Sequence, residues 1–172
     1  MKRTKGEAMW EILTGLLVGT AVSGVLPLVS AELLVVAAAA AVPGLAVPLV
    51  AAVSAIGQMS AKTLLFSLAR WAPAKLPVKA RARIEKASEA VSERGGAASS
   101  IVFTSATLGF PPFYGVSLAC GTLQMPLLPF ILSGTAGRVV RFGVLAWAGH
   151  KFGVPAIALL AERGFASFLV GG

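Results

Sequence analysis

Two long uncharged apolar runs constrain this chain more than any other feature. Residues 12–61 carry one charged side chain, Glu32, and residues 97–137 carry none. Each run is at least twice as long as one bilayer crossing, which takes about 20 residues. Pro and Gly break each run near its middle. The pattern predicts an all-α polytopic membrane protein with irregular backbone at membrane depth, which is tolerated only where protein or a cavity covers it.

Composition supports a membrane class and argues against several kinds of site. Charged residues make up 13% of the chain and mean hydropathy is +0.84, whereas about a quarter of a soluble domain is charged. Asp and Asn are absent, and there is one His and one Cys. The chain therefore lacks a Cys/His zinc set, an Asp-based calcium or magnesium loop and an intrachain disulfide. We predict no metal, no cofactor and no enzymatic activity.

The first apolar run divides into three segments. A helix is expected at about residues 9–24, where Gly15 and Gly19 form a G-x-x-x-G pair that is typical of closely packed membrane helices. The stretch from Pro27 to Pro43 contains Glu32 and is too short to cross a bilayer, but it suits one arm of a re-entrant hairpin. A full crossing helix follows at about residues 48–71.

The central segment, about residues 73–96, is strongly basic. Its apolar residues Ile84, Ala87 and Val91 are spaced three and four apart, which indicates a weakly amphipathic helix. A solvated connector and a helix lying on an anionic leaflet both fit this pattern. Neither composition nor spacing points to nucleic acid, because the net charge of +8 lies mostly outside the apolar runs.

The second half, about residues 97–172, repeats the plan of the first, about residues 9–72. Phe110-Pro111-Pro112 interrupts an apolar arm, and a long helix is expected at about residues 127–149. A final apolar segment, about 154–170, contains Glu162 and Arg163. We predict one integral membrane domain over residues 1–172, a pseudo-repeat with two oppositely oriented re-entrant hairpins and about four transmembrane helices.

Basic residues predict the topology. Three of them precede the first helix and seven lie between Arg70 and Arg94. Because Lys and Arg accumulate on the cytoplasmic side, both the N-terminus and the connector are predicted to be cytoplasmic.

Polar residues inside the apolar segments are the candidate site. Ionisable groups at membrane depth usually face the protein interior and have a partner. The predicted substrate- or ion-binding residues are Glu32, Gln58, Lys62, Arg138 and Arg141. A cavity with this excess of positive charge suits a phosphate-bearing head group, since guanidinium binds phosphate oxygens bidentately.

Structural explanations for the same residues stay open. Glu32 would then pair with an arginine to lock the hairpin, and Arg138 and Arg141 would extend to the interface. Lys62 is also within reach of an interface. For Glu162 and Arg163, a tolerated ion pair competes with a functional role.

Two motifs give the chain a resemblance to a known family. The segment from Leu26-Pro27 through Glu32, followed by the helix at 48–70, resembles the first half of the DedA family, also called the VTT or SNARE-associated domain. The run from Gly121 to Pro126, followed by Gly137-Arg138-Val139-Val140-Arg141-Phe142, resembles the small YqaA-like branch of that family.

The resemblance covers about residues 10–150 and implies opposed re-entrant hairpins and lipid-related transport, sometimes coupled to protons. By position, Glu32 matches the acid of the first hairpin. The family's second acid corresponds to Gln58, and its two hairpin arginines fall near Thr107 and Phe113. The chain therefore lacks part of the set that the family ties to proton-driven transport.

The sequence thus predicts a multi-pass protein of the bacterial inner membrane that translocates or scrambles a phosphate-bearing lipid. Anionic lipids are the expected partners, while protons and a homo-oligomer stay open. The alternatives are a non-transporting assembly or envelope-stress factor and a small-solute exporter. A hydrated cavity at Glu32 and the arginines favours transport, whereas a closed ion pair favours a structural role.

Overall fold

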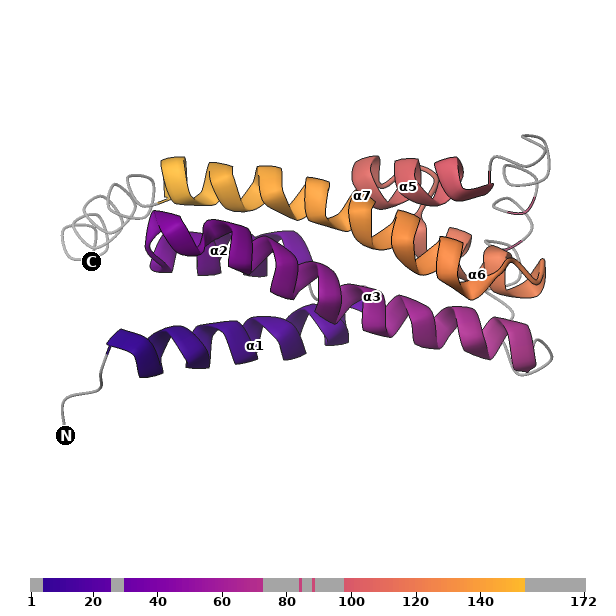
Figure 1. Ribbon diagram of the computed structural model, residues 1–172, viewed down its shortest axis with the longest axis horizontal. Helices are drawn as coiled ribbons and strands as arrows, with labels where there is room; N and C mark the ends of the chain where they lie inside the picture. Colours follow the sequence, from indigo (N-terminus) through magenta and orange to yellow (C-terminus); the bar gives the residue numbers. More distant parts are fainter. Residues whose placement is uncertain (1–4, 26–29, 73–83, 85–87, 89–97, 154–172) are drawn as a thin grey trace, which may run out of the picture.

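The computed structural model describes residues 5–25, 30–72, 84, 88 and 98–153. These residues form helices and short connections (Figure 1). The elements are α1 (Lys5–Val25), α2 (Ala31–Ala41), η1 (Gly44–Ala46), α3 (Val47–Trp71), α5 (Ala98–Leu108), α6 (Phe113–Thr122), α7 (Leu127–Ala148) and the π-helical turn η3 (Gly149–Gly153). The predicted all-α class is confirmed for the described residues.

Among the described residues, three helical stretches are long and apolar enough to cross a membrane. They are Gly6–Val25, Gly44–Trp71 and Leu127–Gly153. The predicted final crossing at 154–170, with Glu162 and Arg163, lies outside the described residues, and so does most of the basic connector at 73–96. Re-entrant placement of α2 and of the α5–α6 hairpin, and the pseudo-repeat, remain predictions.

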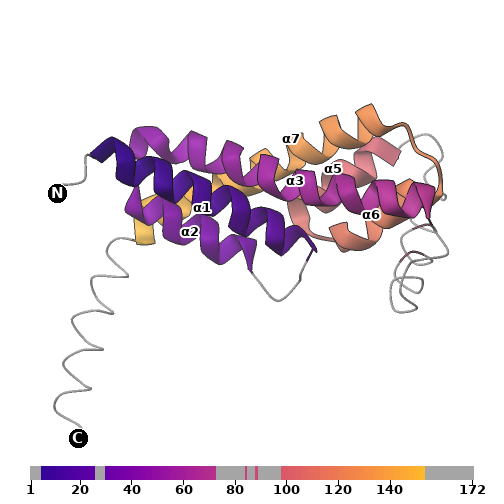
Figure 2. The same cartoon turned by 90° about the horizontal axis from the view of Figure 1, so that it is seen from below.

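Helices α3 and α7 extend along the long axis in opposite directions (Figures 1 and 2). Contacts at both ends fix this arrangement. At the end of α3, Arg70 donates a hydrogen bond to the Met125 carbonyl, 3.0 Å away and just before α7. At the far end of α7, the His150 Nδ1 atom lies 3.3 Å from the carbonyl oxygen of Ala39 in α2.

The shorter helices occupy opposite halves of this pair. Helices α1 and α2 pack along one half, and α5 and α6 pack along the other (Figure 1). Gly149 of η3, directly after α7, lies against Val36 of α2, and Gly137 of α7 lies against Ala106 of α5. Since α2 and α5 both run in the direction of α7, the C-terminus of α5 faces the N-terminus of α2 near the middle of α7.

Local sequence explains both of these helix ends. Ser30 has extended backbone angles and caps α2, because its hydroxyl accepts the Leu33 N–H at 3.3 Å. Gly109 follows α5 with φ +83°, the left-handed region in which glycine has no Cβ penalty. Pro111 and Pro112 come next and lack the N–H donors that would continue a helix.

Close packing between α1 and α3 depends on small residues other than the predicted pair. A Cβ on Gly57 would collide with the Thr20 hydroxyl and the Leu17 carbonyl, and one on Gly24 would collide with Ala61. Nothing lies within 4 Å of the Cβ direction at Gly15. The G-x-x-x-G pair does not make this contact: Gly15 faces open space, and Gly19 lies against Leu34 of α2.

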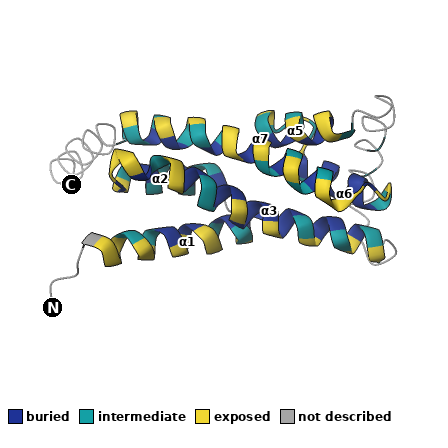
Figure 3. Cartoon of the chain, in the orientation of Figure 1, coloured by how far each residue is buried: buried dark blue, intermediate teal, exposed yellow. Residues whose placement is uncertain are grey.

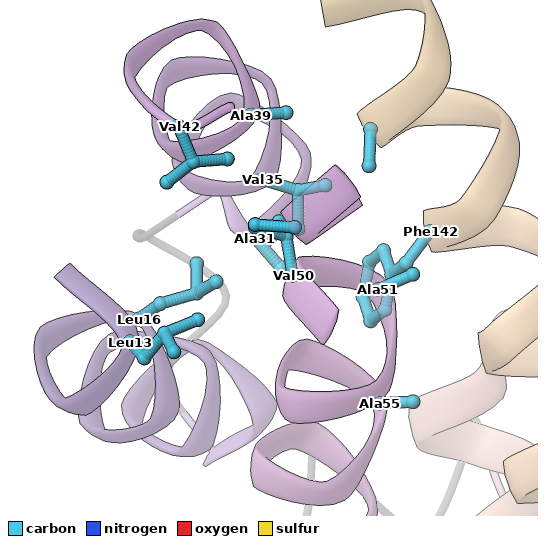
Figure 4. Packing of buried hydrophobic residues seen from close by; sticks show 12 residues of the cluster. Leu13, Leu16, Ala31, Val35, Ala39, Val42, Val50, Ala51, Ala55 and Phe142 are labelled. Atoms are coloured by element: carbon cyan, nitrogen blue, oxygen red, sulfur yellow. The ribbon is translucent and has the colours of Figure 1, made fainter. Parts of the chain in front are cut away.

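The core lies between the helices, and the outer faces stay apolar. Figure 3 shows buried faces turned inward and exposed faces turned outward. One cluster joins α1, α2, α3 and α7 around Val35, Val50 and Phe142, each fully buried (Figure 4). Large apolar side chains such as Leu64 and Leu132 are exposed. An apolar exterior of this extent suits a hydrocarbon environment better than water.

Candidate functional site

Arg141 lies where the ends of α5 and α2 meet. Its Nη2 atom is 2.9 Å from Glu32 Oε1, and its Nη1 atom donates to the Thr107 carbonyl at 3.0 Å. Ser30 holds the other carboxylate oxygen, since its hydroxyl donates to Glu32 Oε2 at 3.1 Å. The guanidinium therefore joins the last turn of one short helix to the first turn of another.

The charges at this junction match the polarity of the two helix ends. Glu32 lies in the first turn of α2, where unpaired N–H groups create a positive end that favours an anion. Thr107 lies in the last turn of α5, where unpaired carbonyls favour a cation. Discontinuous helices with facing ends are a recurrent way of building binding sites at membrane depth.

Arg141 also lines a cavity of about 330 Å³ between α5 and α7. The other lining residues are Thr107, Leu108, Val140, Val144 and Leu145. The Arg141 side chain keeps 25% of its surface exposed, and its buried Nε atom has no hydrogen-bond partner. Because Leu108, Val140 and Val144 are exposed on the outer surface, the cavity combines a cation with apolar walls that face outward.

The remaining candidates are buried, with Gln58 and Lys62 on α3 and Arg138 on α7. Lys62 is 5% exposed and donates to the Gly24 carbonyl at 2.7 Å. Arg138 is 6% exposed, with its guanidinium carbon 4.7 Å from the centre of the Phe113 ring. Gln58 lies one turn before Lys62, and its buried Oε1 atom has no partner.

The five predicted residues are thus divided between two neighbouring places. Glu32 and Arg141 form a direct, partly exposed ion pair at the helix junction, which is the pairing that the structural explanation of Glu32 requires. Gln58, Lys62 and Arg138 are in the interior, so Arg138 and Lys62 do not extend to an interface.

Several groups that shape the candidate site were not predicted from the sequence. Ser30, the Thr107 carbonyl and Gly109 shape the junction, and the Gly24 carbonyl anchors Lys62. Ser30 had a usable signal, since a serine just before an acidic first turn is typical of a helix N-cap. The two carbonyls had none, because every residue carries one.

Comparisons of the chain with protein-family models, curated proteins and solved structures find no match.

Proposed function

We propose that this protein is an integral membrane protein that moves a phosphate-bearing lipid between leaflets, as its resemblance to the DedA family implies. Arg141 binds the phosphate, and Glu32 re-forms its ion pair with the Arg141 guanidinium when the lipid leaves. The acyl chains lie along the apolar walls of the cavity between α5 and α7.

The observation that carries this proposal is the cavity at Arg141. A cation in the lining of an outward-facing apolar cavity complements an amphiphile with an anionic head group. A water-soluble substrate would instead need a polar path through the protein. This difference makes a small-solute exporter the weaker candidate.

The closed pair between Glu32 and Arg141 supports a second candidate, a structural factor without transport. In that case the pair only ties α2 to α7, and removing it lowers stability without changing any flux. Breaking a buried or partly buried pair is destabilising because it leaves one charge without compensation. The two functions therefore predict different effects of the same substitutions. Transport predicts a lower translocation rate, whereas a structural role predicts lower stability with the flux unchanged.

A lipid translocation assay tests the proposal. The protein is reconstituted into vesicles that contain fluorescent phosphatidic acid, and the fraction accessible to an external quencher is followed over time. Arg141→Gln is expected to lower the rate about tenfold or more, because a charge-assisted hydrogen bond contributes about 1.5–3 kcal/mol. Glu32→Gln is expected to lower both the maximal rate and the half-saturating lipid concentration, since the phosphate then leaves Arg141 slowly.

Arg70→Gln is a matched control for Arg141→Gln. Arg70 also donates to a backbone carbonyl at 3.0 Å, but it does so at the end of α3, far from Glu32. It should leave the translocation rate unchanged. Equal rates for wild type, Arg141→Gln and Glu32→Gln, together with lowered melting temperatures for the variants, would establish the structural role instead.

A further inference from the structure

We propose that Arg138, Lys62 and Gln58 form a second station that binds a phosphate monoester group in the interior of the helix bundle. This inference deepens the proposed function, because it gives the head group a place beyond Arg141. It concerns a different set of side chains, so it can be tested without translocation.

The two cations of this station are buried together. Lys62 lies 5.2 Å from the centre of the Tyr114 ring, and Arg138 lies over the neighbouring ring of Phe113. Arg138 is also 5.7 Å from the centre of the Phe142 ring. The guanidinium therefore has aromatic rings of α6 and α7 beside it, and its charge repels that of Lys62.

One carboxylate, Glu32, attracts Arg138 within the described part of the chain, and Arg141 shares it. The described residues contain three acids, Glu7, Glu11 and Glu32. Glu7 and Glu11 lie on α1, and Glu32 forms its ion pair with Arg141. Lys62, Arg138 and Arg141 thus share one carboxylate, and the remaining positive charge is costly where it is buried, because repulsion adds to the loss of hydration. A bound anion would remove both costs.

Two buried hydrogen-bonding atoms without partners indicate which kind of anion would bind. Arg138 Nε is a buried donor without a partner, and Gln58 Oε1 is a buried acceptor without a partner. Hydrogen phosphate, free or as a monoester, presents oxygens to Arg138 and Lys62 and a P–OH group that donates to Gln58. Chloride has no donor and would leave Gln58 unsatisfied.

The station also lies deeper in the protein than the site at Arg141. Arg138 precedes Arg141 by three residues on α7, so the two side chains are neighbours on the helix surface. Exposure falls from the Arg141 side chain at 25% to Arg138 at 6%. A head group that enters at Arg141 would therefore find its next cation toward the core.

Equilibrium binding of radiolabelled inorganic phosphate tests the station. The full chain is placed in nanodiscs of neutral lipid at pH 7, and the label is competed with chloride at constant ionic strength. Wild type and the control Arg70→Gln are expected to bind with similar affinity, and chloride should not displace the label. Arg138→Gln is expected to weaken binding about tenfold or more, since one charge-assisted interaction is lost.

Gln58→Glu provides a variant that should fold well. A carboxylate of nearly the same shape would neutralise the two cations from within. We expect a higher melting temperature without phosphate and loss of phosphate binding. Unchanged phosphate affinity in Arg138→Gln, displacement by chloride, or retained binding in Gln58→Glu would each overturn the station.

Phosphatidic acid in the nanodisc separates the two sources of the phosphate group. Displacement of the label by this lipid would assign the station to a lipid head group, and lack of displacement would assign it to free phosphate. Loss of the station with Arg141-dependent translocation intact would overturn this inference alone. Phosphate binding without any translocation would overturn the proposed function alone.

Discussion

At the scale of single residues, the molecule places its charges where backbone polarity already favours them. Glu32 lies at the positive end of α2, and Arg141 donates to a carbonyl at the negative end of α5. Gly109 makes this geometry accessible, because it has φ +83° and its missing side chain leaves room for the Arg141 guanidinium.

Gly109→Ala should therefore affect both stability and translocation. A Cβ would lie 3.2 Å from Arg141 Nη1, and a left-handed conformation costs an L-residue about 1–2 kcal/mol. We expect the free energy of unfolding in mixed micelles to fall by about that amount, with a slower translocation rate as Arg141 shifts. Gly143→Ala on α7 is the control, since nothing lies within 4 Å of its Cβ direction. Equal effects of the two substitutions would show that Gly109 has no special role.

At the scale of secondary-structure elements, packing is decided by which face of each helix carries small residues. Helix α1 lies against α3 through Thr20 and Gly24 on one side and Gly57 and Ala61 on the other. Close approach of backbones through small residues is a main source of helix association in membranes. The same logic applies between α6 and α3, where a Cβ on Gly121 would collide with the Phe66 carbonyl.

Gly57→Ala is expected to weaken the packing of α1 on α3. The added methyl group would meet the Leu17 carbonyl, which is backbone and cannot turn aside. Overpacking of this kind costs about 1–3 kcal/mol, and thermal melting in detergent should show it. Gly15→Ala adds the same methyl group to α1 in open space and should leave the melting temperature unchanged or higher. A destabilised Gly15→Ala with a neutral Gly57→Ala would reverse the assigned interface.

At the scale of the whole molecule, the fold bears on the membrane topology. The start of α1 lies near η1, whereas the C-terminal end of α3 lies at the opposite end of the long axis (Figures 1 and 2). With this axis along the membrane normal, the start of α1 and the end of α3 would be on opposite sides. The distribution of Lys and Arg instead predicts that both are cytoplasmic.

Single cysteines distinguish these layouts in a Cys120→Ala background, in which the buried native thiol is removed. The exposed positions Gly6, Leu45 and Trp71 are changed to Cys one at a time and labelled with a membrane-impermeant maleimide in oriented vesicles. The fold predicts that Gly6→Cys and Leu45→Cys label from one side and Trp71→Cys from the other. Labelling of Gly6→Cys and Trp71→Cys from the same side would support the layout predicted from the basic residues.

The sequence by itself determined the class and the elements of this protein. Long uncharged runs cannot be hydrated at their full length, so they become apolar helices, and Pro and Gly set where those helices stop. This is why α3 and α7 begin within a residue of their predicted starts. The sequence also identified the polar residues inside these runs as candidates, because burial of an ionisable group is costly and requires a compensating partner.

Only the tertiary structure decided which of those residues meet. Glu32 and Arg141 are far apart in sequence, and nothing in either segment specifies that α2 and α5 point their ends at the same turn of α7. Likewise, Gly57 and Gly24 could not be ranked above Gly15, because a glycine's importance depends on the neighbour that fills its missing side chain. Composition and spacing fix local conformation, whereas the pairing of distant groups depends on how the helices pack.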